Sequence, residues 1–251
     1  MQSNLVFVAE QASVAAHSVK NFREDGIFFL TIWSEVTKWS AMGTRSLKNE
    51  KSRTQKRAKR TRKRLKKAAL DVFSEKSIAA ATVEEITEKA DVGKGTLYQY
   101  FEDKGEIVVT LVDEAIEHLI EKIDSCQKRP EELEGMLEHL LDAHYEFFTD
   151  SREEFILLFQ GKVMAKLQSD ALDELEEPYL RYLEEIENQV STYLSPRIDP
   201  VKIRRLACAV AGFVFGFFSF AMIGMTADEI ETSAQPLRRV FVRSLCSFLG
   251  R

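Results

Sequence analysis

Cysteine and histidine are scarce in this chain, with three and four among 251 residues. Cys126, Cys208 and Cys246 share no metal-ligand spacing, and the histidines form no H-x-x-x-H pair. We therefore expect neither a metal site nor a cofactor. The apolar neighbours of Cys208 and Cys246 favour packed, reduced thiols, with a redox-sensing role as the alternative.

Signatures of several protein classes are also missing. The sequence has no nucleophile–base constellation and no phosphate-binding loop, so we expect no enzyme. Residues 1–41 lack the basic and continuous apolar regions of a signal peptide. No alternating strand pattern with turn signals appears, and helical periodicity covers most of the chain. An all-α fold is the economical interpretation.

The formal net charge of −5 hides an uneven distribution along the chain. Residues 45–67 hold 13 Lys or Arg and one acid, whereas residues 68–251 hold 19 basic and 35 acidic side chains. Such asymmetry indicates one end that faces nucleic acid. We expect residues 45–59 to form a basic flexible arm that follows phosphates or enters a minor groove. A merely solvated tail is the alternative.

Residues 82–104 have the pattern of two short helices joined by a tight turn. Thr82 and Glu85 are spaced as a capping box, and Asp91-Val92-Gly93 ends the first helix. The second helix begins near Lys94 and is anchored inward by Leu97 and Phe101, which lie four residues apart. The rest of its surface carries Lys, Thr, Gln and Tyr, which suits a DNA major groove.

This segment resembles the helix-turn-helix of the TetR family of transcriptional repressors. The matching residues are Thr82, Ile86, Ala90, Val92, Gly93, Gly95, Thr96, Leu97, Tyr98, Tyr100, Phe101 and Lys104. The apolar stripe of the preceding helix also fits, with Leu65, Ala69, Val72 and Phe73. About 45 residues, less than a fifth of the chain, carry the resemblance.

The resemblance assigns DNA contacts to individual residues. It implies phosphate contacts for Thr82, Tyr98 and Lys104. It implies an approach to base edges for Lys94, Gly95 and Thr96, and contacts to bases or backbone for Gln99 and Tyr100. Gly93 stands where many members have Ser, so the phosphate there is expected on the backbone N–H and the helix dipole.

Two other positions depart from the family pattern. Ser77 replaces the Gly that usually ends the first helix, and Ser tolerates a left-handed backbone less well, which leaves room for another cap geometry. Thr87 replaces the usual Ala of the second helix.

The implied organisation is a three-helix DNA-binding domain over residues 60–106, followed by a helical effector-binding and dimerisation domain over 107–251. Residues 1–44 form an N-terminal extension. Met42-Gly43-Thr44 resembles the usual start of such proteins, so our hypothesis is that Met42 is the initiator and residues 1–41 are not native. A genuine extension that packs on the body or binds a partner is the alternative.

Residues 206–225 hold no charge and would pass by length for a membrane span. We favour a buried helix of a soluble, cytoplasmic oligomer, because only one such run occurs and a DNA-binding module precedes it. The resemblance implies a homodimer through two final helices, about 201–224 and 228–249. The expected interface residues are Gly212, Phe213, Gly216, Phe217, Phe220, Phe241 and Leu245. A membrane-anchored DNA binder is the alternative.

Aromatic residues crowd the middle of the chain. The resemblance places an apolar effector pocket among the central helices. The candidate lining residues are Tyr145, Phe148, Phe155, Phe159 and Tyr179, although aromatic side chains at helical spacing also serve as plain core. The sequence thus predicts a regulator, expected to be a repressor released from a palindromic DNA operator by a small hydrophobic effector. An activator or a ligand-independent regulator of the same fold is the alternative.

Overall fold

The computed structural model describes residues 53–125, 129–167 and 173–249. Cys126, the N-terminal extension and residues 45–52 of the expected arm lie outside these ranges. The described chain is all-α, and no strand occurs within it. This agrees with the fold class that the sequence predicts.

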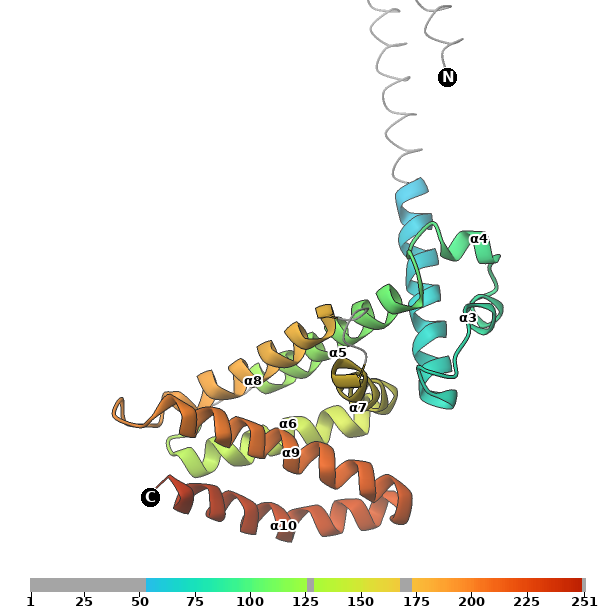
Figure 1. Cartoon of the computed structure of the whole chain (residues 1–251). Coiled ribbons are helices and arrows are strands. Elements are labelled where there is room, and N and C mark those ends of the chain that lie inside the picture. The colour runs from blue at the N-terminus through green and yellow to red at the C-terminus, as the bar shows by residue number, and fades with distance from the viewer. Residues whose placement is uncertain (1–52, 126–128, 168–172, 250–251) are drawn as a thin grey trace, which may run out of the picture. The chain divides into compact units, whose positions relative to one another are not determined.

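The DNA-binding end consists of a long helix over residues 53–76 followed by two short ones (Figure 1). These are α3 (Val83–Lys89) and α4 (Lys94–Leu97). The side chains at the centre of this group are fully buried or nearly so: Leu65, Ala69, Phe73, Ile86, Leu97 and Phe101. The predicted apolar stripe of the first helix is thereby confirmed, and so are the predicted inward anchors Leu97 and Phe101.

The prediction of a flexible arm over residues 45–59 is wrong for the described part of this segment, because residues 53–59 are helical. The reason lies in the composition of this segment. It contains Lys, Arg, Gln and Ala, which are strong helix formers, and it has no Gly or Pro. The helical conformation therefore extends into the cationic block before the helix-turn-helix.

The first helix ends in a left-handed residue even though that residue is not glycine. Ser77 has φ 88°, and its N–H donates to Phe73 O at 3.0 Å. Another cap geometry is therefore not used. The Ser77 hydroxyl accepts from the Ala80 N–H at 3.3 Å, which offsets part of the left-handed cost.

The helix-turn-helix and the helical body after it belong to one compact unit, residues 60–251. Residues 53–59 fall outside that unit. The expected domain boundary after residue 106 falls inside α5 (Lys104–Asp124), the helix that leads from one part to the other. The remaining elements are α6 (Leu133–Asp150), α7 (Arg152–Leu167), η2 (Asp173–Leu175), α8 (Glu176–Ser191), α9 (Pro200–Gly224) and α10 (Ala227–Phe248).

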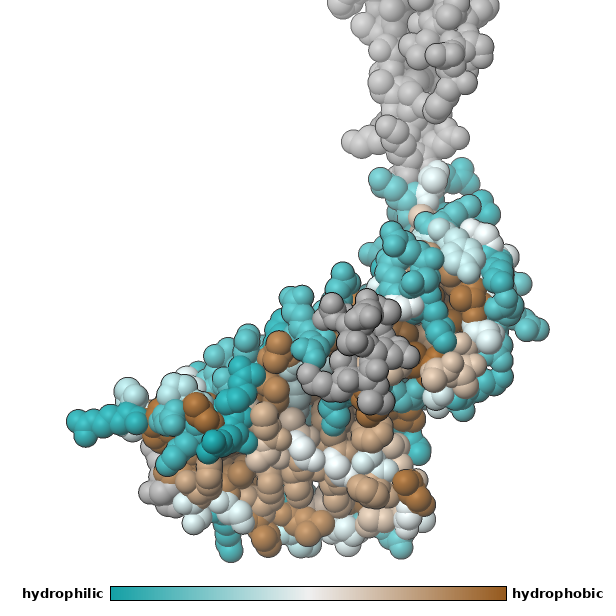
Figure 2. All heavy atoms as spheres, in the orientation of Figure 1, coloured by the Kyte–Doolittle hydropathy of each residue, from teal (hydrophilic) through white to brown (hydrophobic). Residues whose placement is uncertain are grey.

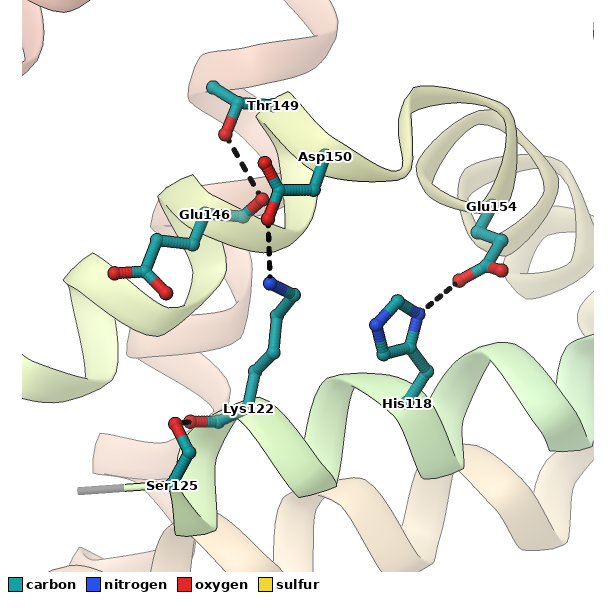
Figure 3. A network of polar contacts seen from close by, with 7 residues as sticks. All are labelled: His118, Lys122, Ser125, Glu146, Thr149, Asp150 and Glu154. Atoms are coloured by element: carbon teal, nitrogen blue, oxygen red, sulfur yellow. Dashed lines mark hydrogen bonds and ion pairs between the residues drawn. The ribbon is translucent and has the colours of Figure 1, made fainter. Parts of the chain in front are cut away.

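Polar contacts fix the start of α7 to α5 and α6 (Figure 3). His118 Nδ1 of α5 lies 2.8 Å from Glu154 of α7. One helical turn further along α5, Lys122 donates to Asp150 at 2.8 Å, and this contact lowers the pKa of the Asp150 carboxyl. The two contacts join α5 to both sides of the corner between α6 and α7.

Candidate DNA-binding site and effector domain

The first helix of the motif has the cap that the sequence predicts. The Thr82 hydroxyl accepts from the Glu85 N–H at 3.3 Å, and Glu85 accepts from the Thr82 N–H at 3.1 Å. Thr87 is buried, and its hydroxyl donates to Glu84 O at 3.0 Å, so this departure from the family pattern leaves no unpaired polar group. The Thr82 side chain itself stays exposed at the start of the helix.

The turn between α3 and α4 is held by a residue that the motif did not single out. Arg64, on the preceding helix, donates to Ala90 O at 2.5 Å and to Asp91 O at 3.1 Å. Asp91 has φ 51°, a left-handed conformation that Asp tolerates better than most residues. Arg64 thus satisfies the carbonyls that α3 leaves unpaired at its end, and it sets where α4 begins.

Helix α4 presents its polar residues and hides its apolar ones. Leu97 and Phe101 are buried, whereas the Tyr98 side chain is 52% exposed. The exposed positions are Gly93, Lys94, Gly95, Tyr98 and Gln99, with Thr96 and Tyr100 half-buried. Seven of the nine residues expected to meet DNA therefore lie in one short, accessible stretch over residues 93–100, which comprises α4 and the turn after it, whereas Thr82 and Lys104 lie outside this stretch.

The two glycines leave the start of α4 open. A Cβ built at Gly93 or Gly95 meets no atom within 4 Å, so the space in front of them is free for a ligand backbone. Gly93 is the N-cap and has no side-chain cap bond. Because α4 is only four residues long, free backbone N–H groups rather than a helix dipole would hold a phosphate there.

Lys94 is paired within the motif. Its ammonium contacts Glu84 of α3, and this contact raises the lysine pKa and lowers the pKa of the Glu84 carboxyl. Both side chains remain exposed, so the pair is weak and solvent-screened. A DNA phosphate would compete with Glu84 for the same ammonium.

The phosphate contact expected for Lys104 is not supported by its position. Its ammonium donates to Ile78 O and Ala81 O, both at 2.8 Å, and to Ala79 O at 3.5 Å. A lysine ammonium has three hydrogens, and these carbonyls occupy them. Lys104 therefore stabilises the turn before α3.

The five aromatic residues expected to line an effector pocket do not surround one cavity. Phe155 is buried and stacks on Phe215 with ring centroids 5.2 Å apart. Tyr179 donates to Leu158 O at 2.6 Å, and Phe159 is exposed. Two of the five line cavities: Tyr145 borders one of about 80 Å³ and one of about 260 Å³, and Phe148 borders the larger.

The expected dimer surface is exposed only in part: Gly212 and Phe220 are exposed, whereas Phe213, Gly216 and Phe217 are half-buried. Phe220 is 77% exposed on α9, next to a shallow apolar depression that Gly212, Phe213, Gly216 and Phe217 also line. Figure 2 shows apolar residues gathered over the face formed by α9 and α10. Phe241 of α10 is half-buried and stacks on Phe213 with ring centroids 4.1 Å apart.

The predicted position in the dimer interface is wrong for one residue. Leu245 is buried inside the chain, as is the neighbouring Val242 of α10. The exposed apolar face of α10 carries Leu237, Val240 and Phe248 instead. The apolar residues of α10 therefore divide between a part that packs on the body and a part that is open to solvent. Cys208 is likewise exposed rather than packed.

Helix α9 is, within the described part of the chain, the one helix long and apolar enough to cross a membrane. Seven of its residues are buried, among them Val210, Val214 and Phe218, so it packs as a core helix along one face. Arg204 near its start pairs with Glu187 of α8. A membrane span would have to give up this packing.

The DNA-binding motif matches a known protein family. Residues 65–111 match the family described as bacterial regulatory proteins of the tetR family. The chain is 25% identical over 122 residues to the uncharacterized HTH-type transcriptional regulator YvdT of Bacillus subtilis, covering 49% of this chain and 62% of that protein. It is 24% identical over 101 residues to the HTH-type transcriptional activator FasR of Mycolicibacterium smegmatis, covering 40% and 46%. The chain thus spans under two thirds of the length of these relatives.

The fold extends the match beyond the DNA-binding end. The crystal structure of the regulator FadR from Bacillus subtilis in complex with stearoyl-CoA is similar with a TM-score of 0.58 at 18% identity. The match covers 71% of this chain and 96% of that one, and at this identity it shows a shared fold. The helix-turn-helix geometry and the family match agree, and over residues 65–111 the chain carries a DNA-binding domain of the tetR family of bacterial regulatory proteins.

Proposed function

We propose that this protein is a cytoplasmic, homodimeric DNA-binding transcriptional regulator, a repressor that a small hydrophobic effector releases from a palindromic operator. The observation that carries the proposal is the segment formed by α4 and the turn after it, which exposes Lys94, Tyr98 and Gln99 while Leu97 and Phe101 anchor it. Exposed polar side chains on a helix that is fixed from below are what base and phosphate contacts require.

Each exposed residue has a role in this proposal. The open start of α4 brings Gly93 and Gly95 against the DNA backbone, and Lys94 and Thr96 reach toward base edges. Tyr98 donates to a phosphate, and Thr82 does the same from the start of α3. The neighbouring helix over residues 53–76 adds cations to this end of the chain. This sequence-independent attraction makes binding fall steeply with salt.

A dimer is what lets two such helices read one operator. A palindrome presents half-sites about 34–36 Å apart along DNA. Helices α9 and α10 supply the self-complementary surface, because their open face is apolar and Gly212 and Gly216 allow close approach of backbones. Burial of this face would remove the largest exposed apolar side chains of the body from water.

The effector controls the distance between the two α4 helices in this proposal. An effector shifts the population only if it binds the released state more tightly than the DNA-bound one. The complex of FadR with stearoyl-CoA makes molecules with an acyl chain the first candidates to test.

A second candidate is transcriptional activation on the same fold. The name of FasR favours it, since that matched relative is an activator. Reporter assays on the regulated promoter, with and without the protein, separate the two.

Operator mapping tests the DNA-binding part of the proposal. We expect footprints of two half-sites on DNA upstream of the gene of this protein. Tyr98→Phe is expected to weaken binding about tenfold through the loss of one hydrogen bond to a charged group. Lys94→Gln is expected to reduce the slope of log affinity against log salt by about 1, and Lys104→Gln to leave it unchanged. Unchanged affinity in Tyr98→Phe, with Tyr193→Phe of the body as the control, would count against the assigned contact.

A further inference from the structure

One charged contact at the DNA-binding end differs from the others in the helices that it joins. The Lys94 ammonium, at the start of α4, donates to Oε1 of Glu84 on α3. Three other lysine–glutamate pairs at this end hold the first helix against α3 or α5: Lys76 with Glu85, Lys89 with Glu75 and Lys66 with Glu114. The Glu84 contact, unlike these three, reaches α4, the helix proposed to enter the major groove.

Both members of this pair are charged and open to solvent. More than half of each side chain is exposed. The hydrogen bond from Lys94 lowers the pKa of the Glu84 carboxyl, and the same contact raises the pKa of the lysine, so both groups are ionised at neutral pH. The neighbouring Glu85 is used elsewhere, because it caps α3 and pairs with Lys76. DNA that reaches the Lys94 ammonium therefore also meets the Glu84 carboxylate.

A carboxylate is poorly suited to the DNA backbone. An ionised carboxylate has no hydrogen to donate to a phosphate, and the two negative charges repel each other. The charges of Lys94 and Glu84 also cancel, so the pair adds little to the sequence-independent attraction of the cationic first helix. The edges of the bases do offer hydrogens to a carboxylate, above all at N4 of cytosine. The pair is therefore better suited to base edges than to phosphates.

The donors and acceptors of the pair match the major-groove edge of a G·C base pair. Glu84 takes one of the three ammonium hydrogens of Lys94, which leaves two for N7 and O6 of guanine. The carboxylate has about four acceptor positions and keeps room for the N4 hydrogen of cytosine. Guanine O6 and cytosine N4 are hydrogen-bonded to each other in the base pair, so they are spaced like the two contacting groups of the protein.

An A·T pair fits less well. Its donor, N6 of adenine, lies between two acceptors, N7 of adenine and O4 of thymine. A lysine beside a carboxylate on N6 would therefore reach one acceptor instead of two. The difference is one hydrogen bond from a charged donor, which favours G·C.

We propose that Glu84 is a specificity-determining residue and that it reads, together with Lys94, one G·C pair in each half-site of the operator. Lys94 donates to guanine, and Glu84 accepts from cytosine. This inference rests on the proposed function in placing α4 in the major groove. It adds a residue of α3 to the base contacts and names the base pair. Glu84 also weakens binding to unrelated DNA, because a phosphate beside Lys94 meets the carboxylate.

Selection of binding sites from duplexes of randomised sequence, with the full chain, tests this assignment. We expect the wild type to enrich sites with a G·C pair at one position of each half-site. Lys94→Ala should abolish the preference at this position, Glu84→Ala should weaken it, and both should keep the preferences elsewhere. Glu75→Ala is the matched control and should keep every preference. It removes the same charge and breaks a lysine pair of similar exposure that does not reach α4.

Affinities for the selected duplex, and for the same duplex with this pair changed to A·T in both half-sites, give the size of the effect. The wild type should lose at least about tenfold on the change. Glu84→Ala should lose about threefold or less, because the lysine remains but the acceptor for cytosine is gone. On unrelated DNA, Glu84→Ala should bind more tightly than the wild type, with a slope of log affinity against log salt that is steeper by about 1.

Three results would overturn the assignment. They are an unchanged base preference in Glu84→Ala, an equal loss of preference in Glu75→Ala, and a loss that falls on an A·T position. The first would leave Glu84 as a brace between α3 and α4 that changes stability alone. Absence of any enriched sequence with the wild type refutes the proposed function itself. An enriched palindrome whose preferences all survive in Glu84→Ala refutes this inference alone.

Discussion

Gln160 of α7 accepts a hydrogen bond from the Ile78 N–H at 2.7 Å. Its amide nitrogen donates to Phe73 O at 3.1 Å, so one side chain of the body satisfies two backbone groups where the first helix ends. Lys104 holds the next carbonyls of the same turn. The turn before α3 is thus fixed by α5 and α7, and a shift of α7 would reach the DNA-binding end through Gln160.

Gln160→Leu tests this contact. The change nearly preserves volume but leaves the Ile78 N–H without a partner and removes one of the two hydrogen bonds that Phe73 O accepts. We expect the free energy of unfolding to fall by about 2 kcal/mol. Urea denaturation measures it. Gln189→Leu is the control, because Gln189 bonds only to the side chains of Asp124 and Glu185, and its loss should cost clearly less. Equal costs in the two variants would show that the turn does not depend on Gln160.

Ser77 gives a prediction about backbone strain. At φ 88° a side chain with a Cβ costs roughly 1–2 kcal/mol, which glycine avoids at the expense of greater freedom in the unfolded chain. We compare Ser77→Gly with Ser77→Ala, because both remove the hydroxyl that accepts from Ala80. The Gly variant should be more stable than the Ala variant by about 1 kcal/mol in urea denaturation. A more stable Ala variant would mean that the residue is not left-handed in solution.

Local features of the chain were predictable from the sequence. The Thr82–Glu85 capping box, the Asp103 cap of α5 and the ends of α9 and α10 depend on residues within a few positions of one another. The left-handed backbone of Ser77 also depends on local residues, but a Ser at the end of a helix does not indicate this conformation as a Gly would.

Features that depend on distant contacts were not predictable. Lys104 meets carbonyls 23 to 26 residues earlier, so its role in the turn appears only when the helices pack. Leu245 and Leu237 are both apolar residues of α10, yet one faces the body and the other faces solvent. Aromatic spacing on α6 and α7 could not show that Phe148 and Phe155 pack against each other rather than around a ligand.

The proposed dimer face gives a prediction about assembly. Phe220→Asp places a charge on the open face of α9, where it would be buried and unpaired in a dimer, so we expect monomers by light scattering after size-exclusion chromatography. Phe220 is exposed within one chain, and helicity should therefore persist. Leu180→Asp changes an exposed apolar residue of α8 and should leave the dimer intact. If Phe220→Asp also remains dimeric, the interface lies elsewhere.

His144 makes the stability of the body depend on pH. The ring is fully buried in α6, its Nδ1–H donates to Leu140 O at 2.5 Å, and its Nε2 accepts from the Tyr182 hydroxyl at 2.6 Å. Burial disfavours the charged form and lowers the pKa of His144 from 6.5 to about 4. The folded protein therefore keeps His144 neutral in a range where the unfolded chain binds a proton.

The sign of the effect follows from this difference. The contribution is fully present above pH 6.5 and is lost as the pH falls toward 4, because acid favours the unfolded chain that takes up the proton. Across this window we expect a loss of about 3 kcal/mol from His144 alone. His144→Gln should remove this part of the pH dependence, although it also lowers stability at pH 7. Tyr182→Phe is the control, since it deletes the hydroxyl but keeps a buried histidine, and it should retain the acid sensitivity. An unchanged pH dependence in His144→Gln would assign the acid sensitivity to other groups.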